Sequence, residues 1–334
     1  MEKGSIKTLI LGLVASLLIG SGVGAGVYFY LQNRETNTVE TSQETEEETT
    51  TSTTPAVQAT FEEEEGTLNN GFLYEKVWVE NPTSKAKLLV TICFPDQSEP
   101  APLILMIPGG LGDGNDFFTN DEITAQLLGK GYVVGFFSAE GRGQSDGEED
   151  YNGTINQDGM HAVLVYLASR KEVDAERIGV VSFSYGVTVA SGMLARYADD
   201  PNVDFYIDWE GPSAREYTNV GCRDKGNNTE GIAWKDCDDN EWWAEREAVN
   251  FLDDLTMPYL RVQSEVDHVQ KSNEHAIAAI NAAVSGPSPW TRVNGSENPI
   301  DTTYTMENSP QWLPNRSGKT HVVEYVEEMA GMFF

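Results

Sequence analysis

Apolar runs typical of buried strands recur along the chain, and from Leu103 onward they alternate with helical segments. Continuous apolar runs are typical of parallel strands that are covered on both faces. The pattern therefore predicts an α/β fold with a mostly parallel sheet flanked by helices, and an antiparallel pair formed by the first two strands. We expect strands at 72–79, 88–94, 103–107, 132–137, 178–181, 203–207, 259–262 and 290–293, and helices at 121–128, 157–170, 187–198, 272–284 and 322–329.

A stretch without charge, residues 8–31, precedes this pattern and is long enough to span a bilayer as a helix. Basic residues come before it and an acidic run follows, which places residues 1–7 in the cytoplasm and the rest outside. A cleaved signal peptide is the alternative, because Val23 and Ala25 fit a small-residue cleavage site. The apolar run continues to Leu31, which favours an uncleaved anchor. We expect a single-pass protein of the cell membrane, or a secreted one if the segment is cleaved.

Residues 32–66 are rich in Thr and Glu, which predicts a disordered, acidic tether. The remaining residues, 67–334, have the length of one large α/β domain. The net charge of the chain is −31 at pH 7, and most of it falls after residue 66. Because such a surface repels phosphate, we expect no nucleic-acid partner.

The alternation of strands and helices is interrupted at about 211–256, which predicts a lid inserted between the strands at 203–207 and 259–262. Cys222 and Cys237 flank a polar loop there, and their spacing permits a disulfide outside the cell without specifying one. The sequence has no cysteine–histidine cluster of the kind that holds zinc, so neither a metal nor a cofactor is predicted.

Ser184 lies between a predicted strand and a predicted helix, with the small residues Ser182 and Gly186 two positions to either side. This spacing is typical of a nucleophile elbow, whose tight turn has no room for bulky neighbours. The turn would direct the hydroxyl toward a helix N-terminus, where backbone N–H groups can bind an oxyanion. Strand–helix junctions also carry Ser and Gly for packing alone, so the elbow does not by itself establish catalysis.

Four further features resemble the α/β-hydrolase superfamily across 68–334. A Pro-Gly-Gly-Leu loop at 108–111 and an Arg-Gly-Gln-Ser-Asp-Gly turn at 142–147 precede the elbow, and an acid-bearing segment at 258–269 and the late His321 follow it. The turn and the tyrosine after the serine are similar to the X-prolyl dipeptidyl-peptidase and cocaine-esterase branch. The compact size is similar to the dienelactone-hydrolase-like branch.

The resemblance implies a catalytic triad of Ser184, Asp267 and His321. His321 is the expected base because it lies in a polar turn before the last helix. His268 directly follows Asp267, and neighbours in sequence point apart, so it is a poor partner for that acid. Asp208, at the end of the preceding strand, is the alternative acid.

The expected oxyanion donors are the backbone N–H of Tyr185 and that of Gly110 or Leu111. Trp209 and Glu210 follow a strand at the edge where pockets form, and they are expected to contact substrate. Glu210 is the candidate for binding a substrate amine, and a solvated carboxylate without a substrate role is the alternative.

We therefore expect a membrane-tethered serine hydrolase outside the cytoplasm that cleaves a small ester or a peptide through an acyl-enzyme. A serine peptidase of the prolyl-peptidase type is one alternative. A non-catalytic surface binding module on a hydrolase fold is the other.

Overall fold

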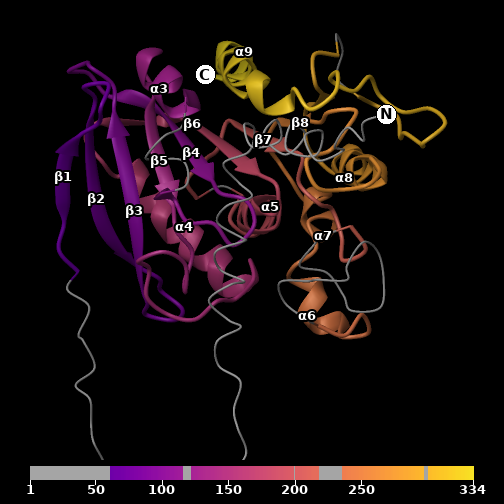
Figure 1. Cartoon of the computed structure of the whole chain (residues 1–334), viewed down its shortest axis with the longest axis horizontal. Coiled ribbons are helices and arrows are strands. Elements are labelled where there is room, and N and C mark those ends of the chain that lie inside the picture. Colours follow the sequence, from indigo (N-terminus) through magenta and orange to yellow (C-terminus); the bar gives the residue numbers. More distant parts are fainter. Residues whose placement is uncertain (1–60, 116–121, 199, 218–234, 297–299) are drawn as a thin grey trace, which may run out of the picture. The chain divides into compact units, whose positions relative to one another are not determined.

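A nine-stranded sheet in the order β1-β2-β3-β5-β4-β6-β7-β8-β9 organises the described residues (Figure 1). Neighbouring strands from β5 through β4 to β9 are parallel, and β1, β2 and β3 extend the sheet as an antiparallel edge. The predicted α/β fold is thereby confirmed. The strands are β1 (Glu64–Thr67), β2 (Leu73–Glu80), β3 (Lys87–Phe94), β4 (Ala101–Ile107), β5 (Val133–Phe137), β6 (Val173–Phe183), β7 (Phe205–Trp209), β8 (Tyr259–Val262) and β9 (Thr291–Val293).

The computed structural model describes residues 61–115, 122–198, 200–217, 235–296 and 300–334. The predicted membrane span at 8–31, residues 1–7, which are predicted to be cytoplasmic, and most of the predicted tether lie outside them. Among the described residues, no helix has both the length and the apolar character needed to cross a membrane.

The sheet begins inside the segment that was predicted to be a disordered tether. Strand β1 pairs with β2, and its Glu64 accepts a hydrogen bond from the Tyr74 hydroxyl at 2.6 Å and pairs with Lys76 at 3.1 Å. High charge therefore does not exclude an edge strand, because its carboxylates can be matched by the neighbouring strand.

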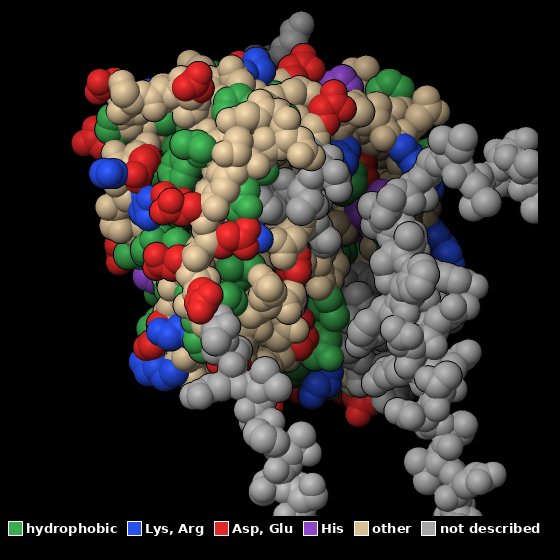
Figure 2. Space-filling model, turned by 60° about the vertical axis from the view of Figure 1, so that its left-hand side comes forward, with side chains coloured by type: hydrophobic (Ala, Val, Ile, Leu, Met, Phe, Trp, Pro, Cys, Tyr) green, Lys and Arg blue, Asp and Glu red, His purple; other side chains and the backbone are tan. Residues whose placement is uncertain are grey.

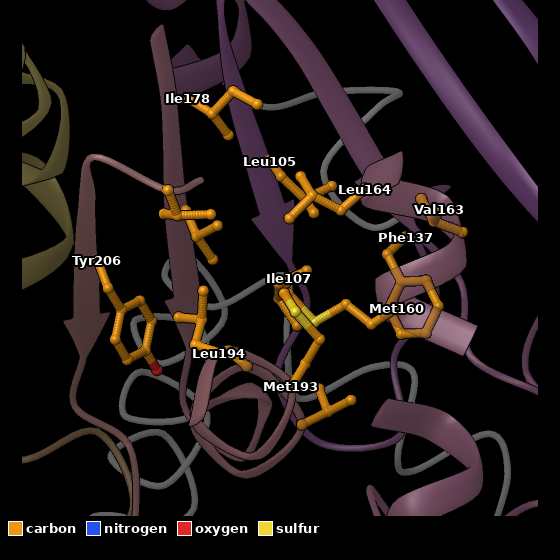
Figure 3. Packing of buried hydrophobic residues seen from close by; sticks show 14 of the residues in the cluster. Leu105, Ile107, Phe137, Met160, Val163, Leu164, Ile178, Met193, Leu194 and Tyr206 are labelled. Atoms are coloured by element: carbon orange, nitrogen blue, oxygen red, sulfur yellow. The ribbon is translucent and has the colours of Figure 1, made fainter. Parts of the chain in front are cut away.

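Helices cover both faces of the sheet (Figure 1). One face packs against α4 (Thr154–Ala168), α5 (Gly186–Arg196) and α8 (Glu274–Ser285), and the other against α3 (Glu122–Gly129) and α9 (Val322–Phe333). Successive residues of β4 point to opposite faces of the sheet. Leu105 and Ile107 pack in one hydrophobic cluster with Met160 of α4 (Figure 3), whereas Met106 packs in the other cluster with Leu127 of α3. This two-sided burial explains why the strands are continuous apolar runs.

The segment between β7 and β8 contains two short helices, α6 (Asn240–Ala244) and α7 (Val249–Leu252), neither of which was predicted. We call the described residues 235–256 of this segment the β7–β8 segment; they fall within the predicted lid at 211–256. Trp243 of α6 is fully buried and packs against Cys237, which is disulfide-bonded. Cys222, which the sequence permits as the partner of Cys237, lies outside the described residues.

On the face shown in Figure 2, acidic side chains are spread over the coloured surface with basic side chains between them. The acidity of the chain therefore belongs to the surface of the folded domain as well as to the Thr/Glu-rich segment.

Candidate active site

Ser184 lies in the turn between β6 and α5, and its φ of 50° is in the left-handed region that side-chain-bearing residues seldom adopt. Its N–H donates to the carbonyl of Trp209 at 2.8 Å. A Cβ at Gly186 would come within 2.6 Å of the Pro108 carbonyl oxygen, and one at Gly109 within 2.8 Å of the Ser184 Cβ. The glycines therefore permit a close approach that holds the strained turn in place.

His268, in the loop after β8, joins the serine to an acid. Its Nε2 lies 2.9 Å from Ser184 Oγ, and its Nδ1 lies 2.9 Å from Glu210 Oε2. The imidazole packs on the indole of Trp209 with ring centroids 4.5 Å apart. A nucleophile hydrogen-bonded to a base that is in turn held by an acid is the arrangement that activates serine.

Glu210 follows β7 and is held rigidly. Its φ of 48° is also left-handed, and its side chain is 1% exposed. One carboxylate oxygen accepts the N–H of Ser264 at 3.0 Å, and the other accepts the N–H of His268 at 3.1 Å. With Glu210 accepting from the Nδ1–H of the imidazole, Nε2 is left to take a proton from Ser184.

Three backbone N–H groups around Ser184 are available to an oxyanion. Gly110 has a left-handed φ of 58° in a turn closed by the Gly112 N–H donating to the Gly109 carbonyl. Within the described part of the chain, the N–H groups of Tyr185, Gly110 and Leu111 donate to no protein acceptor. These are the three donors that the sequence suggested.

Comparison with known proteins identifies the fold that holds these residues. A family model described as X-Pro dipeptidyl-peptidase (S15 family) matches residues 84–207. Dipeptidyl peptidase 4 of Porphyromonas gingivalis superposes with a TM-score of 0.59 at 18% identity, over 78% of this chain and 35% of that one. An S-formylglutathione hydrolase from Agrobacterium tumefaciens gives a TM-score of 0.59 at 11% identity, over 81% of this chain and 99% of that one. The chain has the α/β-hydrolase fold.

Acetyl xylan esterase 1 from Thermoanaerobacterium sp. is a further α/β-hydrolase structure that is similar, with a TM-score of 0.55 at 14% identity over 83% of this chain and 89% of that one. The chain spans about a third of the length of dipeptidyl peptidase 4 of Porphyromonas gingivalis and of a putative dipeptidyl aminopeptidase IV from Bacteroides ovatus, which match its structure. No curated protein matches the sequence. The matched family segment contains Ser184 but ends before Glu210 and His268, so their roles follow from the geometry alone.

His321 is not brought to Ser184 in this structure. It ends a short 3₁₀ turn, η1 (Gly318–His321), where its Nδ1 lies 3.1 Å from Glu324 Oε2 and its side chain is 35% exposed. The loop after β9 reaches the site through Gly318 instead, whose N–H donates to Ser264 Oγ at 2.9 Å. A Cβ at Gly318 would lie 3.1 Å from Glu210 Oε1. The glycine, three residues before His321, is therefore the part of the turn that packs against the acid.

Asp267 is not the principal partner of the base. Its Oδ1 lies 3.4 Å from His268 Nδ1, farther than Glu210, and accepts the N–H groups of Val269 and Gln270 at 2.7 and 2.6 Å. Its Oδ2 faces His275 Nε2 at 3.2 Å. Burial raises the pKa of Asp267, but the hydrogen bond and charge of His275 outweigh burial and hold that pKa below its usual range. Asp267 thus lies within ion-pair distance of His268, but the shorter contact of His268 Nδ1, at 2.9 Å, is with Glu210, which follows another strand.

The alternative acid, Asp208, faces away from the base as well. It is fully buried, forms an ion pair with Arg261 and accepts the Tyr259 hydroxyl at 3.0 Å. Glu210 does not have the substrate-facing position that was expected, whereas a contact of Trp209 with substrate stays a prediction. Both oxygens of Glu210 are engaged within the protein, and the Trp209 ring packs between His268 and Phe183.

Glu210, Asp267 and His268 are, in the described residues, the group whose oxygen and nitrogen atoms approach closely enough to hold a metal ion. Their hydrogen bonds to one another and to backbone amides already account for the cluster.

A cavity of about 590 Å³ lies elsewhere, lined by Pro102 at the start of β4, Lys130 and Arg177. Because it is at the amino ends of the parallel strands, it is separate from Ser184 at their carboxyl ends.

Proposed function

We propose that this α/β-hydrolase is a serine hydrolase that cleaves ester or amide bonds with Ser184, His268 and Glu210 as its catalytic triad. The observation that carries the proposal is the hydrogen-bonded line from Ser184 Oγ through His268 to Glu210, with 2.9 Å at each step. The left-handed conformations of both Ser184 and Glu210 support it, because such strain concentrates at functional sites.

In the proposed reaction, His268 Nε2 takes the proton of Ser184 Oγ as that oxygen attacks the substrate carbonyl carbon. Glu210 stabilises the imidazolium that forms. The carbonyl oxygen becomes an oxyanion, which the N–H groups of Tyr185 and of Gly110 or Leu111 bind. His268 then protonates the leaving group, and an acyl-enzyme remains. Water attacks this ester with His268 again as base, which releases the acid and restores Ser184.

A prolyl-type peptidase activity is the second candidate, and the match of 84–207 to the X-Pro dipeptidyl-peptidase family favours it. The esterase structures favour a small ester. Initial rates on p-nitrophenyl acetate and on a glycyl-prolyl p-nitroanilide separate the two. A peptidase cleaves the anilide efficiently, whereas a simple esterase leaves it intact.

We further propose that residues 8–31 anchor the protein in the cell membrane with the hydrolase domain outside, or are cleaved to release it. The uncharged length of the segment and the basic residues before it support this placement. Fractionation of cells expressing the full chain tests it. Activity that stays in the cytosol after lysis would contradict both forms of the proposal.

Covalent labelling with a fluorophosphonate tests the catalytic proposal. We expect rapid labelling of the wild type, none of Ser184→Ala, and slow labelling of His268→Ala. His321→Ala is the matched control and should label at the wild-type rate. A folded wild type that does not label would favour the non-catalytic binding module. Loss of labelling in His321→Ala would favour the triad expected from the sequence, with His321 as the base.

A further inference from the structure

A polar loop between β5 and α4 contacts the residue that follows the nucleophile. Two consecutive residues of this loop, Tyr151 and Asn152, have left-handed φ values of 53° and 65°. Residues with side chains avoid this region, and a bulky tyrosine does so strongly. Such a pair persists only where the surrounding contacts determine it, so the loop must be held by specific interactions.

Asn152 is the centre of these interactions and is fully buried. Its Oδ1 accepts from Arg142 Nη2 at 2.8 Å, and its backbone N–H donates to Asn156 Oδ1 at 3.0 Å. Its Nδ2 donates to the carbonyl of Tyr185 at 2.8 Å. Arg142 is itself fixed by a bidentate pair with Glu149, at 2.7 Å for each bond. The Asn152 amide therefore has a single defined orientation.

Tyr185 is held at two points by this loop. Its carbonyl accepts from Asn152, and its hydroxyl donates to the carbonyl of Tyr151 at 2.6 Å. The ring is buried, and burial raises the pKa of Tyr185, so the hydroxyl remains protonated as a donor. The N–H of the same residue is a proposed oxyanion donor, and such donors act over a narrow range of distance. The two contacts thus set where that N–H points.

The β7–β8 segment is joined to the same loop through Arg246, which is buried. Its Nε donates to the Asp150 carbonyl at 2.9 Å, and its Nη2 forms an ion pair with the Asp150 carboxylate. The other Asp150 oxygen accepts the N–H of Ile155 at 3.0 Å near the start of α4. The Arg246 guanidinium stacks at 4.3 Å on Trp242, whose ring lies 6.1 Å from that of Tyr151.

We propose that Asn152 is a positioning residue for the oxyanion-binding N–H of Tyr185, and that Arg246 ties this N–H to the β7–β8 segment. The inference rests on the proposed serine hydrolase function. It follows that a displacement of the β7–β8 segment changes the rate of the chemical step more than the affinity for substrate.

Asn152→Gly tests the first half, because glycine accepts the left-handed backbone while the side-chain hydrogen bonds are lost. For p-nitrophenyl acetate we expect kcat to fall by about 10- to 100-fold with KM little changed. The affinity for benzyl trifluoromethyl ketone should fall by the same factor. This probe adds reversibly to Ser184 Oγ: the C–O bond forms, the carbonyl electron pair moves to oxygen, and the serine proton passes to His268. Wild-type kcat and wild-type ketone affinity in folded Asn152→Gly would overturn the proposal.

Arg246→Met tests the second half, and Arg215→Met is the matched control. Arg215 pairs with Glu247 at 2.7 Å and packs on Trp243 of the same segment, but among the described residues it forms no hydrogen bond or ion pair with 149–153. Arg246→Met should lower kcat and ketone affinity together, and its effect should be non-additive with Asn152→Gly. Arg215→Met should change kcat by less than about threefold. Equal losses in the two arginine variants would remove the role of Arg246.

Two further measurements keep the tests separate. If Asn152→Gly does not fold, Tyr185→Phe removes only the hydroxyl contact. It should lower kcat and ketone affinity in parallel, and unchanged values would overturn the proposal. Failure of the proposed serine hydrolase function can be told apart from failure of the Asn152 proposal. If the hydrolase proposal fails, Ser184→Ala hydrolyses p-nitrophenyl acetate as fast as the wild type.

Discussion

Two acids at the end of β7, Asp208 and Glu210, provide a direct test of the triad. They lie two residues apart, yet Glu210 holds His268 while Asp208 pairs with the fully buried Arg261. We expect Glu210→Gln to impair catalysis and Asp208→Asn to impair stability. Both substitutions keep the size of the side chain and remove one negative charge, so they form a matched pair.

The structure sets the size of each effect. In Glu210→Gln the imidazolium of the transition state loses its carboxylate and the tautomer of His268 is no longer fixed, so kcat should fall by about 10³- to 10⁴-fold. That loss corresponds to about 4–5.5 kcal/mol of activation free energy. In Asp208→Asn the Arg261 charge is left unpaired with no exposure to water, which should lower the free energy of unfolding by about 3–5 kcal/mol.

Urea unfolding and ester hydrolysis of each variant measure the two effects separately. Activity should be expressed per folded molecule, so that the loss of stability in Asp208→Asn is not mistaken for a loss of catalysis. We expect its kcat to fall by less than about tenfold. The reverse result, with Asp208→Asn stable but inactive and Glu210→Gln active, would refute the assignment of Glu210 and make Asp208 the acid.

Three further predictions concern Gly318, Asp267 and Cys93. Gly318→Ala would place a Cβ 2.8 Å from Ser264 Oγ and 3.1 Å from Glu210 Oε1, so kcat for ester hydrolysis should fall. Gly331→Ala in α9 is the control, because open space surrounds Gly331 and kcat should not change. Equal kcat values in the two variants would show that the turn at Gly318 does not support Glu210. Because the pKa of Asp267 is depressed in the folded protein, its carboxylate stabilises the fold at pH values above the unfolded pKa of about 3.9. This contribution begins to be lost as the pH falls toward that value and is gone once the pH has fallen through the folded pKa. Urea unfolding between pH 6 and pH 3 should therefore show a weaker pH dependence for Asp267→Asn than for the wild type, and an identical slope would contradict this. Burial raises the pKa of Cys93 to about 12, so iodoacetamide at pH 8 should modify this thiol only after the protein unfolds, as mass spectrometry of the native and denatured protein can show.

The fold was predictable because its strands are buried on both faces and therefore leave uninterrupted apolar runs in the sequence. Strand β6 and helix α5 were found on either side of Ser184 for this reason, and β9 was found at 291–293. The helices α6 and α7 were not predicted, because with five and four residues they are too short to show a helical period. Strand β1 was missed because its pairing with Lys76 and Tyr74 is a long-range contact that composition does not show.

The order of residues along the chain placed His321 beside Ser184, whereas the structure places His268 there, and the order of strands in the sheet explains this difference. Strands β6, β7 and β8 are consecutive neighbours and parallel, so their carboxyl ends lie side by side at about 5 Å spacing. Ser184 follows the first, Glu210 the second and His268 the third, and the loop after β8 brings His268 into contact with both Ser184 and Glu210.

His321 follows β9, one strand farther from Ser184, and its loop packs against Glu210 through Gly318. The chain positions of Glu210 and His268 at the ends of adjacent strands were visible in the sequence. Their partnership was not, because it depends on the left-handed turn at Glu210, which redirects that side chain away from the direction of Asp208. A glutamate has no intrinsic preference for this conformation, so the turn is set by the hydrogen bonds of its carboxylate to Ser264 and His268, which exist only in the assembled fold.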